Sequence, residues 1–431
     1  MKNLSKFQLI VFGVFAGFFI VGILVFAMFR TGDRTPAIEV LIWGSMSRNQ
    51  FSAVMSSTGL DKNEEIKINY VEKRPESFDQ ELLEAIASGQ SPDLFFVDSD
   101  LLNQRSQRIF KVPLASFSER TFKNSFVEGS EIFLTEDGIW AFPTIVDPLV
   151  MYWNRDIFTS AGIVEPPRFW DEFFDLAEKL TRKDPNLNIS RSAVALGEYS
   201  NINHSLEILS SLVMQAGNPI TEKMVGSGIR NIFEESRGLP AIPADRALSF
   251  YTEFSNPLKP FYSWNRALPR SKEHFISGNL AIYFGFASEL FEIRDRNPNL
   301  NFDVSILPQA DVANGRLTYG KFEGLAINAR SGDIAGAFRV ASILTSADSA
   351  LAFSQVRNLP PARRDLLSSR PERAFMETFY QSAIISRQWF IPDVGQANRI
   401  FQNMIESVTG GRARVRDAVQ RAHRELELLF N

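Results

Sequence analysis

Hydrophobic and polar positions follow two different periods along the chain. Short apolar runs bounded by Gly, Pro or Asp predict strands at residues 38–43, 66–71, 91–98, 192–196, 280–284 and 302–307. Apolar residues spaced three or four positions apart predict amphipathic helices at residues 49–56, 77–88, 156–161, from about 168, 203–216, 243–254, 331–345 and 412–430. Strands that alternate with helices predict a mixed α/β fold.

The stretch from Gly138 to Thr181 has the strongest apolar pattern. It begins with a short predicted strand at 139–142, which we expect Pro143 to end, because proline cannot donate a hydrogen bond to a ladder. The apolar and aromatic run at 145–154 then predicts a buried strand. A lone carboxylate, Asp147, lies near its start, and an isolated charge among apolar residues is costly unless it is paired or hydrated.

An uncharged segment of 23 residues lies near the N-terminus, from Phe7 to Phe29. At ~1.5 Å per residue it can span a ~30 Å hydrocarbon layer. No small-residue cleavage site follows it, so we expect an uncleaved signal anchor, with a cleaved signal peptide as the alternative. Lysines before it place residues 1–6 in the cytoplasm, residues 30–37 form a polar linker, and the body is expected on the extracytoplasmic side of the cell membrane.

Composition narrows the functional classes. A length of 431 residues favours two domains, and a net charge of -4 gives no reason to expect a nucleic-acid partner. The chain has no cysteine, which excludes thiolate nucleophiles and disulfides, and its three histidines lie far apart in sequence, so no metal site and no cofactor are expected. Hydrolase and phosphate-loop motifs are absent from the sequence, and we expect a protein that is not an enzyme.

An ordered set of motifs follows the central strand. The run Tyr152-Trp153-Asn154 is followed by Ala161-Gly162, then Pro166-Pro167, then Trp170-Asp171-Glu172 at the start of a helix. This order resembles the extracellular solute-binding proteins, family 1, the maltose and multiple-sugar type that serves ABC importers. One departure is Phe169, because the family usually has a Thr there as an N-cap.

The resemblance implies a two-lobe periplasmic-binding-protein fold of type II, here preceded by one N-terminal transmembrane helix. The first lobe would comprise residues 38–145 with 309–345, and the second residues 146–308 with 346–431. It also implies hinge segments near 144–147, 306–308 and 346–353, closure of the lobes on a small solute, and docking on ABC permease transmembrane subunits.

The resemblance and the chemistry of sugar recognition together suggest ligand-binding residues. Aromatic faces cover the apolar faces of a pyranose, and polar side chains bind its hydroxyls. The candidates are the aromatic residues Trp43, Tyr199, Trp264, Phe286 and Trp389 and the polar residues Ser45, Asp98, Asp147 and Glu323. For Trp43 and Trp264, core packing is an equal alternative.

Two other functions stay open. The same fold could serve as a ligand sensor without transport, and a pair of carboxylates could hydrolyse a glycoside in an anchored hydrolase. The ligand is expected to be a carbohydrate, although members of such a family also take polyols, phosphodiesters, polyamines or metal chelates.

Overall fold

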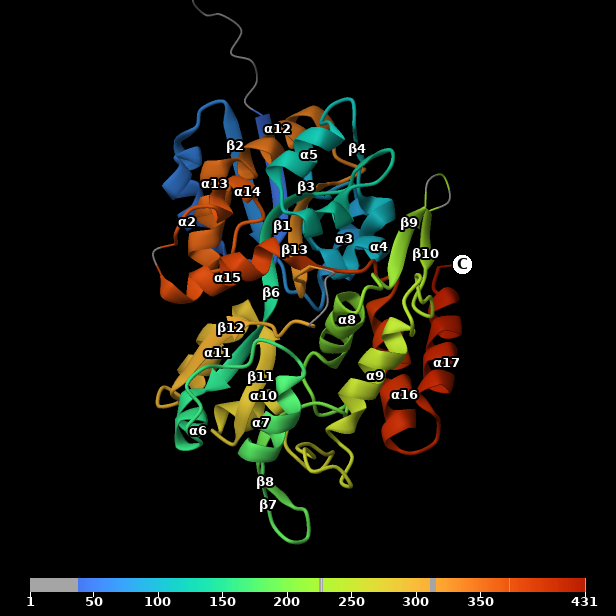
Figure 1. Cartoon of the computed structure of the whole chain (residues 1–431). Helices are drawn as coiled ribbons and strands as arrows, with labels where there is room; N and C mark the ends of the chain where they lie inside the picture. The colour runs from blue at the N-terminus through green and yellow to red at the C-terminus, as the bar shows by residue number, and fades with distance from the viewer. Residues whose placement is uncertain (1–37, 225, 227, 311–314, 372, 431) are drawn as a thin grey trace, which may run out of the picture.

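A ten-stranded mixed sheet runs through the molecule (Figure 1), in a computed structural model that describes residues 38–224, 226, 228–310, 315–371 and 373–430. The strand order is β2-β1-β3-β13-β6-β11-β8-β7, with β12 paired to β6 and β14 paired to β13. The strands are β1 (Ile38–Gly44), β2 (Ile66–Glu72), β3 (Leu94–Asp98), β6 (Phe142–Asn154), β7 (Arg182–Lys183), β8 (Ile189–Val194), β11 (Leu280–Phe286), β12 (Phe302–Ile306), β13 (Thr318–Ile327) and β14 (Ser386–Arg387). The predicted α/β class is confirmed.

Helices gather around the two ends of this sheet (Figure 1). The half that contains β1 to β3 carries α2 (Arg48–Thr58), α3 (Phe78–Ala87), α4 (Leu102–Arg105), α5 (Glu119–Ser125), α12 (Ile334–Leu344), α13 (Ala347–Arg357) and α14 (Arg364–Leu367). The half that contains β8 and β11 carries α6 (Arg155–Ser160), α7 (Glu172–Leu180), α8 (Ser205–Gln215), α9 (Pro243–Glu253), α10 (Ser271–Ile276), α11 (Leu290–Arg296), α16 (Val394–Thr409) and α17 (Val415–Glu427). Between the halves, α15 (Ala374–Ile384) packs against β6 and β12.

The long strand β6 connects the two halves, because it pairs with β13 along its first part and with β11 and β12 along its second. The prediction that Pro143 ends a strand is wrong, since Pro143 lies inside β6. The register between β6 and β13 shifts at Glu323 and Gly324, so that Thr144 is the extra residue of a bulge. A bulge is one of the few positions at which a sheet accepts proline.

The expected division of the chain differs from the structure after residue 346. Residues 346–353 were expected to form a hinge and to begin a second-lobe segment, but they lie at the start of α13, which packs against α2. Phe353 contacts Phe51 there, with ring centroids 6.3 Å apart, so its apolar side chain belongs to the core of the first half. Further along, α16 and α17 pack against α9 in the second half.

The region with no predicted structure, residues 220–241, contains a hairpin of β9 (Thr221–Met224) and β10 (Gly228–Asn231). The hairpin has few apolar residues and no alternating pattern, which is why its strands could not be predicted. A short 3-10 segment, η4 (Glu128–Phe133), lies in the first half near this hairpin.

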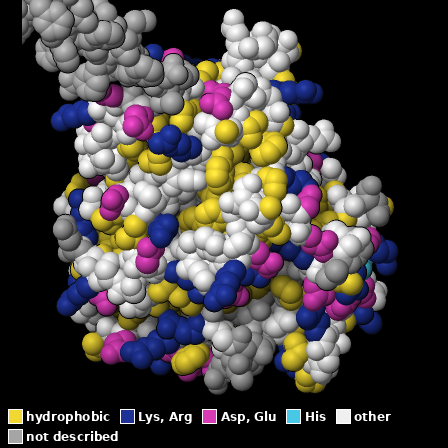
Figure 2. All heavy atoms as spheres, turned by 90° about the horizontal axis from the view of Figure 1, so that it is seen from above, with side chains coloured by type: hydrophobic (Ala, Val, Ile, Leu, Met, Phe, Trp, Pro, Cys, Tyr) yellow, Lys and Arg dark blue, Asp and Glu magenta, His cyan; other side chains and the backbone are white. Residues whose placement is uncertain are grey.

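The expected membrane anchor at residues 7–29 lies outside the described residues. Within the described part of the chain, no helix has the length and apolarity that crossing a membrane requires. Figure 2 shows acidic and basic side chains mixed over the face seen from above, with hydrophobic side chains between them. This mixture agrees with the small net charge of -4.

Candidate functional site

A cavity of ≈ 400 Å³ lies where β3, β6 and β13 meet, between the two halves of the molecule. We call it the central cavity. Its lining residues are Asp98, Asp100, Leu101, Ile145, Asp147, Ser288, Lys321, Phe322, Glu323, Arg357, Leu359 and Val394. A cleft beside strand ends is a usual position for a ligand in an α/β protein.

Strand geometry explains how the charged side chains come together. Asp98 is the last residue of β3 and lies opposite Glu323 of β13. Two residues earlier in β13, Lys321 lies opposite Asp147 of β6. Because side chains two residues apart on a strand share one face, Lys321 and Glu323 both point into the central cavity.

Lys321 binds carboxylates from both halves. Its Nζ lies 3.0 Å from Oδ2 of Asp100, just after β3, and 3.5 Å from Oε1 of Glu207 on α8. Burial opposes the charge of Lys321, but Asp100 and Glu207 outweigh it and hold the pKa of this amine above its usual value. The ammonium also lies 4.8 Å from the ring centroid of Phe286, within cation–π distance.

Glu323 is paired with two side chains of the first half. Its Oε2 accepts from Nη1 of Arg357 at 3.3 Å, and its Oε1 accepts from the hydroxyl of Thr144 at 3.3 Å. The negative charge of Glu323 raises the pKa of Arg357. Arg357 is therefore held as a cation against the first half of the molecule.

Asp98 and Asp147 have fewer partners. Burial, together with the nearby charges of Glu323 and Asp100, raises the pKa of Asp98 to about 6. The Asp98 side chain keeps contact with solvent, so it stands in a recess that water still reaches. Among the described residues, it has neither a hydrogen bond nor an ion pair within 4.0 Å.

Asp147 is half-buried, and its Oδ1 accepts a hydrogen bond from the backbone N–H of Ser288 at 3.0 Å. Burial raises the pKa of Asp147 to about 6, and the hydrogen bond from Ser288 opposes that rise. Both carboxylates are therefore acceptors with lone pairs left to bind a ligand.

The structure brings three of the predicted site residues into the central cavity, namely Asp98, Asp147 and Glu323. Phe286 lies beside the central cavity. Its ring centroid is 4.8 Å from Nζ of Lys321 and 4.8 Å from the ring centroid of His204. Tyr199 donates its hydroxyl to Asn398 at 2.5 Å and does not line the cavity.

Two further predicted aromatic residues, Trp43 and Trp264, and Ser45 also lie outside the central cavity. Trp43 is 6% exposed and packs under Nζ of Lys73, 3.8 Å from its ring centroid. Trp264 is fully buried and donates Nε1–H to Oδ1 of Asn201 at 3.1 Å. For both tryptophans the structure shows the packing alternative. Ser45 is exposed in the turn after β1 and is not a lining residue.

Lys321, Arg357 and Glu207 were not among the predicted site residues. Lys321 lies two residues before Glu323 in β13, so a strand predicted there would have placed both side chains on one face. Arg357 and Glu207 lie on helices and reach the site only through tertiary packing, so no local pattern marks them.

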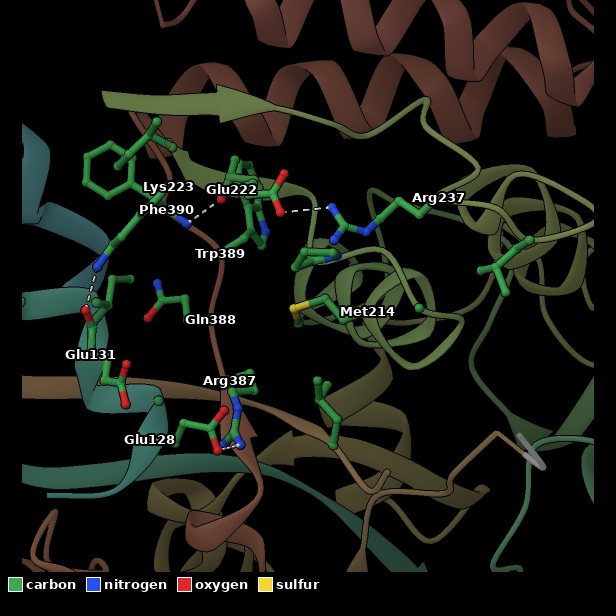
Figure 3. A pocket seen from close by; sticks show the side chains of 18 residues that line it. Glu128, Glu131, Met214, Glu222, Lys223, Arg237, Arg387, Gln388, Trp389 and Phe390 are labelled. Atoms are coloured by element: carbon green, nitrogen blue, oxygen red, sulfur yellow. Dashed lines mark hydrogen bonds and ion pairs between the residues drawn. The ribbon is translucent and has the colours of Figure 1, made fainter. Parts of the chain in front are cut away.

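A larger cavity of ≈ 960 Å³ lies between η4, the end of α8, the β9–β10 hairpin and residues 387–390. Trp389 lines it but is 2% exposed, and its Nε1–H donates to Ser210. Figure 3 shows that basic side chains of this cavity point toward acidic or carbonyl partners, with Arg237 against Glu222 at 3.1 Å and Arg387 against Glu128.

In the same cavity, Nζ of Lys223 donates to the carbonyl oxygen of Glu131 at 2.7 Å (Figure 3). The same Nζ donates to the carbonyl oxygen of Leu134 at 2.6 Å. Each of these three cations therefore already has a partner in the protein, and Trp389 is the one predicted site residue among the described lining residues of this cavity. The central cavity is smaller, but it contains the carboxylates with free acceptor capacity, so we take it as the candidate site. The described residues contain no group of three or more acidic or histidine side chains that could hold a metal ion.

Solved structures with the same fold cover nearly the whole chain. A cyclo/maltodextrin-binding protein with bound maltotetraose has a TM-score of 0.73 at 15% identity, over 92% of this chain and 98% of that one. A cyclic α-maltosyl-1,6-maltose-binding protein of Arthrobacter globiformis has a TM-score of 0.72 at 15% identity, over 91% of this chain and 99% of that one. A solute-binding protein of Thermotoga lettingae with bound α-D-tagatose has a TM-score of 0.62 at 17% identity, over 91% and 100%. At such identities, these likenesses show the fold.

Sequence comparison gives two further findings. A Brucella abortus protein, described as a candidate binding protein, is 31% identical over 102 residues, which are 23% of this chain and 25% of that protein. The chain therefore aligns with about a quarter of that relative's length. The family model of the bacterial extracellular solute-binding proteins matches residues 51–351, well over half of the chain. The expected resemblance is confirmed, and the chain belongs to the bacterial extracellular solute-binding protein family.

Proposed function

We propose that this protein is an extracytoplasmic receptor that binds a sugar or oligosaccharide in the central cavity and delivers it to the transmembrane subunits of an ABC importer. Its family, and the maltodextrin and tagatose bound by proteins of the same fold, support this proposal. The observation that carries it is the pair of carboxylates, Asp98 and Asp147, that keep free acceptor capacity inside a cavity between the halves.

Sugar hydroxyls are good donors to ionised carboxylates, and such charge-assisted hydrogen bonds are about twice as strong as neutral ones. Asp98 comes from the first half, whereas Asp147 lies on β6, which continues into the second. A ligand that bonds to groups from both halves binds the closed arrangement better, so it shifts an open–closed equilibrium toward closure. The closed form would then be recognised by the importer.

We further propose that residues 7–29 anchor the protein in the cell membrane, with the body on the extracytoplasmic side. The support is the uncharged 23-residue segment and the lysines before it. An anchor would raise the receptor's concentration near its importer. Alkaline carbonate extraction of membranes from cells that express the full chain tests this proposal, because an anchored protein stays in the pellet.

Thermal-shift screening of the full chain against a panel of neutral mono- and oligosaccharides tests the function itself. At least one sugar should raise the Tm in a saturable manner, and Asp147→Asn should weaken its binding by about tenfold, the loss of one charge-assisted hydrogen bond. The control is Glu165→Gln, which removes an exposed carboxylate outside the cavity. If no carbohydrate shifts the Tm of the native protein, the sugar assignment is wrong.

A further inference from the structure

The central cavity has an excess of acidic groups that its own cations do not neutralise. From this arrangement we infer that the bound solute carries a positively charged amino group. The inference rests on the proposed function in one respect, because it takes the central cavity as the ligand site. It goes further in naming the charge of the ligand.

The first argument is the balance of charges. Four carboxylates line the cavity, from Asp98, Asp100, Asp147 and Glu323, against two cations. Both cations are already engaged. Lys321 pairs with Asp100 and with Glu207, and Arg357 pairs with Glu323. Another negative charge, that of Glu207, therefore adjoins the cavity and makes the imbalance larger.

The second argument concerns Asp98 and Asp147, the two carboxylates left over. Within the described part of the chain, Asp98 has no hydrogen bond or ion pair, and Ser288 alone donates hydrogen bonds to Asp147. A carboxylate that lies among other carboxylates and is not paired with a cation is destabilised in its charged form. An ammonium group bound beside either carboxylate would supply the missing countercharge and up to three hydrogen-bond donors.

The third argument is the absence of a free aromatic face among the described lining residues. Phe322 is the one aromatic side chain that lines the cavity, and it is fully buried. Phe286, beside the cavity, already has the Lys321 ammonium over its ring. A neutral pyranose would therefore gain little from stacking, and binding strength has to come mainly from charge and hydrogen bonds.

Aminated sugars and linear polyamines both offer primary ammonium groups, and both are small enough for a cavity of ≈ 400 Å³. The aminated sugar agrees with the proposed function, because it keeps the hydroxyl donors of a carbohydrate. The two sources share one chemistry and can be separated by experiment.

Isothermal titration of the full chain in detergent with a matched set of disaccharides tests the inference. The set is the β-1,4-linked glucosamine disaccharide, its N-acetylated form and cellobiose, which share one skeleton and differ at the 2-position. We expect the glucosamine disaccharide to bind at least about tenfold more tightly than either neutral form. Raising the salt concentration to about 0.5 M should reduce that preference, because the interaction is electrostatic.

Asp147→Asn and, separately, Asp98→Asn should each reduce the preference for the amino sugar, whereas the exposed-carboxylate control Glu165→Gln should keep it. Circular dichroism melting confirms that each variant is folded, and either Asn variant alone is sufficient for the test. A preference that survives both Asn substitutions overturns the inference.

The possible outcomes distinguish the two proposals. If cellobiose or the N-acetylated form binds as tightly as the amino sugar, the charge inference fails and the proposed function stands. If spermidine binds while no saccharide does, the charge inference holds and the sugar assignment fails. Binding of neither the amino sugar nor spermidine overturns the charge inference, and the neutral glycan panel then decides the proposed function alone.

Discussion

The ammonium of Lys321 lies 3.0 Å from the Asp100 carboxylate, and the same nitrogen lies 3.5 Å from Glu207. Asp100 belongs to the half that contains β3, whereas Glu207 lies on α8 of the other half. A single cation on a strand shared by both halves therefore connects carboxylates that would otherwise repel each other. This arrangement makes Lys321 a determinant of how closely the halves approach.

Lys321→Met should open the ligand-free protein. Without the cation, the carboxylates of Asp100 and Glu207 lack a shared countercharge. We expect the free energy of unfolding to fall by about 1–3 kcal/mol, because removal of one partner leaves unpaired charges in a recessed site. Small-angle X-ray scattering should show a larger radius of gyration than for the native protein. Lys67→Met is the control, because Lys67 also pairs with a carboxylate, Glu39, at 2.8 Å but on the exposed edge of the sheet. Equal radii for both variants would contradict this role of Lys321.

Asp147→Asn should change how stability depends on pH. The pKa of Asp147 is raised to about 6 in the folded protein, against ~3.9 in an unfolded chain. Between these values the folded state binds more protons than the unfolded state, so the contribution of Asp147 to stability falls as pH rises through this window. The contribution is most favourable below about pH 4 and reaches its lowest, constant level above about pH 6.

The substitution should therefore stabilise the ligand-free protein at about pH 7.5 and have a clearly smaller effect at about pH 4.5. The difference should be on the order of 1 kcal/mol, since partial access to water reduces the ~1.4 kcal/mol expected per unit of pKa shift. Thermal melts of both proteins at the two pH values measure it. A variant that is less stable than the native protein at the higher pH would contradict the assignment of Asp147 as an uncompensated carboxylate.

The polar part of the candidate site was easier to predict than the aromatic part. Asp98 ends a strongly apolar run and Asp147 interrupts another, so both are exceptions to a clear pattern. A tryptophan at a strand end fits packing and ligand stacking equally well, which is why Trp43 and Trp264 could not be assigned from the sequence. Their burial is decided by partners such as Lys73 and Asn201, which are distant in sequence.

The central strand shows the same limit in the fold. Its apolar residues predicted a buried strand at 145–154, and that strand is confirmed as the larger part of β6. The bulge that admits Pro143 depends on the register with β13, which is distant in sequence, so the sequence alone predicted a break instead. Local pattern predicts which residues are buried, whereas tertiary pairing decides where strands begin.

Trp264→Phe should separate stability from ligand binding. The change removes the donor to Oδ1 of Asn201 and leaves that buried acceptor unpaired, at a cost of about 1–3 kcal/mol. Because Trp264 does not line the central cavity, the relative affinities for a series of ligands should stay as they are in the native protein. Thermal melting and titration calorimetry test the two parts, and altered ligand preference would place Trp264 in the binding site after all.

Gly129→Ala should destabilise the contact of η4 with β13 and β14. A Cβ at this position would lie 2.2 Å from Cζ of Phe322 and 2.3 Å from the carbonyl oxygen of Ser386, so the backbone of β14 would have to move. Overpacking of this kind costs about 1–3 kcal/mol. Gly332→Ala is a matched control, because a Cβ there meets no atom within 4 Å. Equal melting temperatures for the two variants would show that this contact adapts without cost.

Lys223→Met should release the β9–β10 hairpin from the first half. Nζ of Lys223 donates to the carbonyl oxygens of Glu131 and Leu134, and burial lowers the pKa of this amine to about 8. The unfolded chain binds the proton up to about pH 10.4, so between about pH 8 and 10.4 the unfolded state binds more protons. The contribution of Lys223 to stability must therefore rise with pH across this window.

The methionine variant should lose that rise, which thermal melts of both proteins at about pH 7.5 and about pH 9.5 can detect. Hydrogen exchange should also become faster at the amides of β9 and β10, because the hairpin loses the two bonds that Lys223 makes to the first half. Lys179→Met on the exposed face of α7 serves as the control and should change neither measurement. If exchange in the hairpin stays at its native rate, Lys223 does not hold the hairpin in place, and the neighbouring contact between Gly226 N–H and the Glu136 carboxylate at 3.0 Å is the stronger connection.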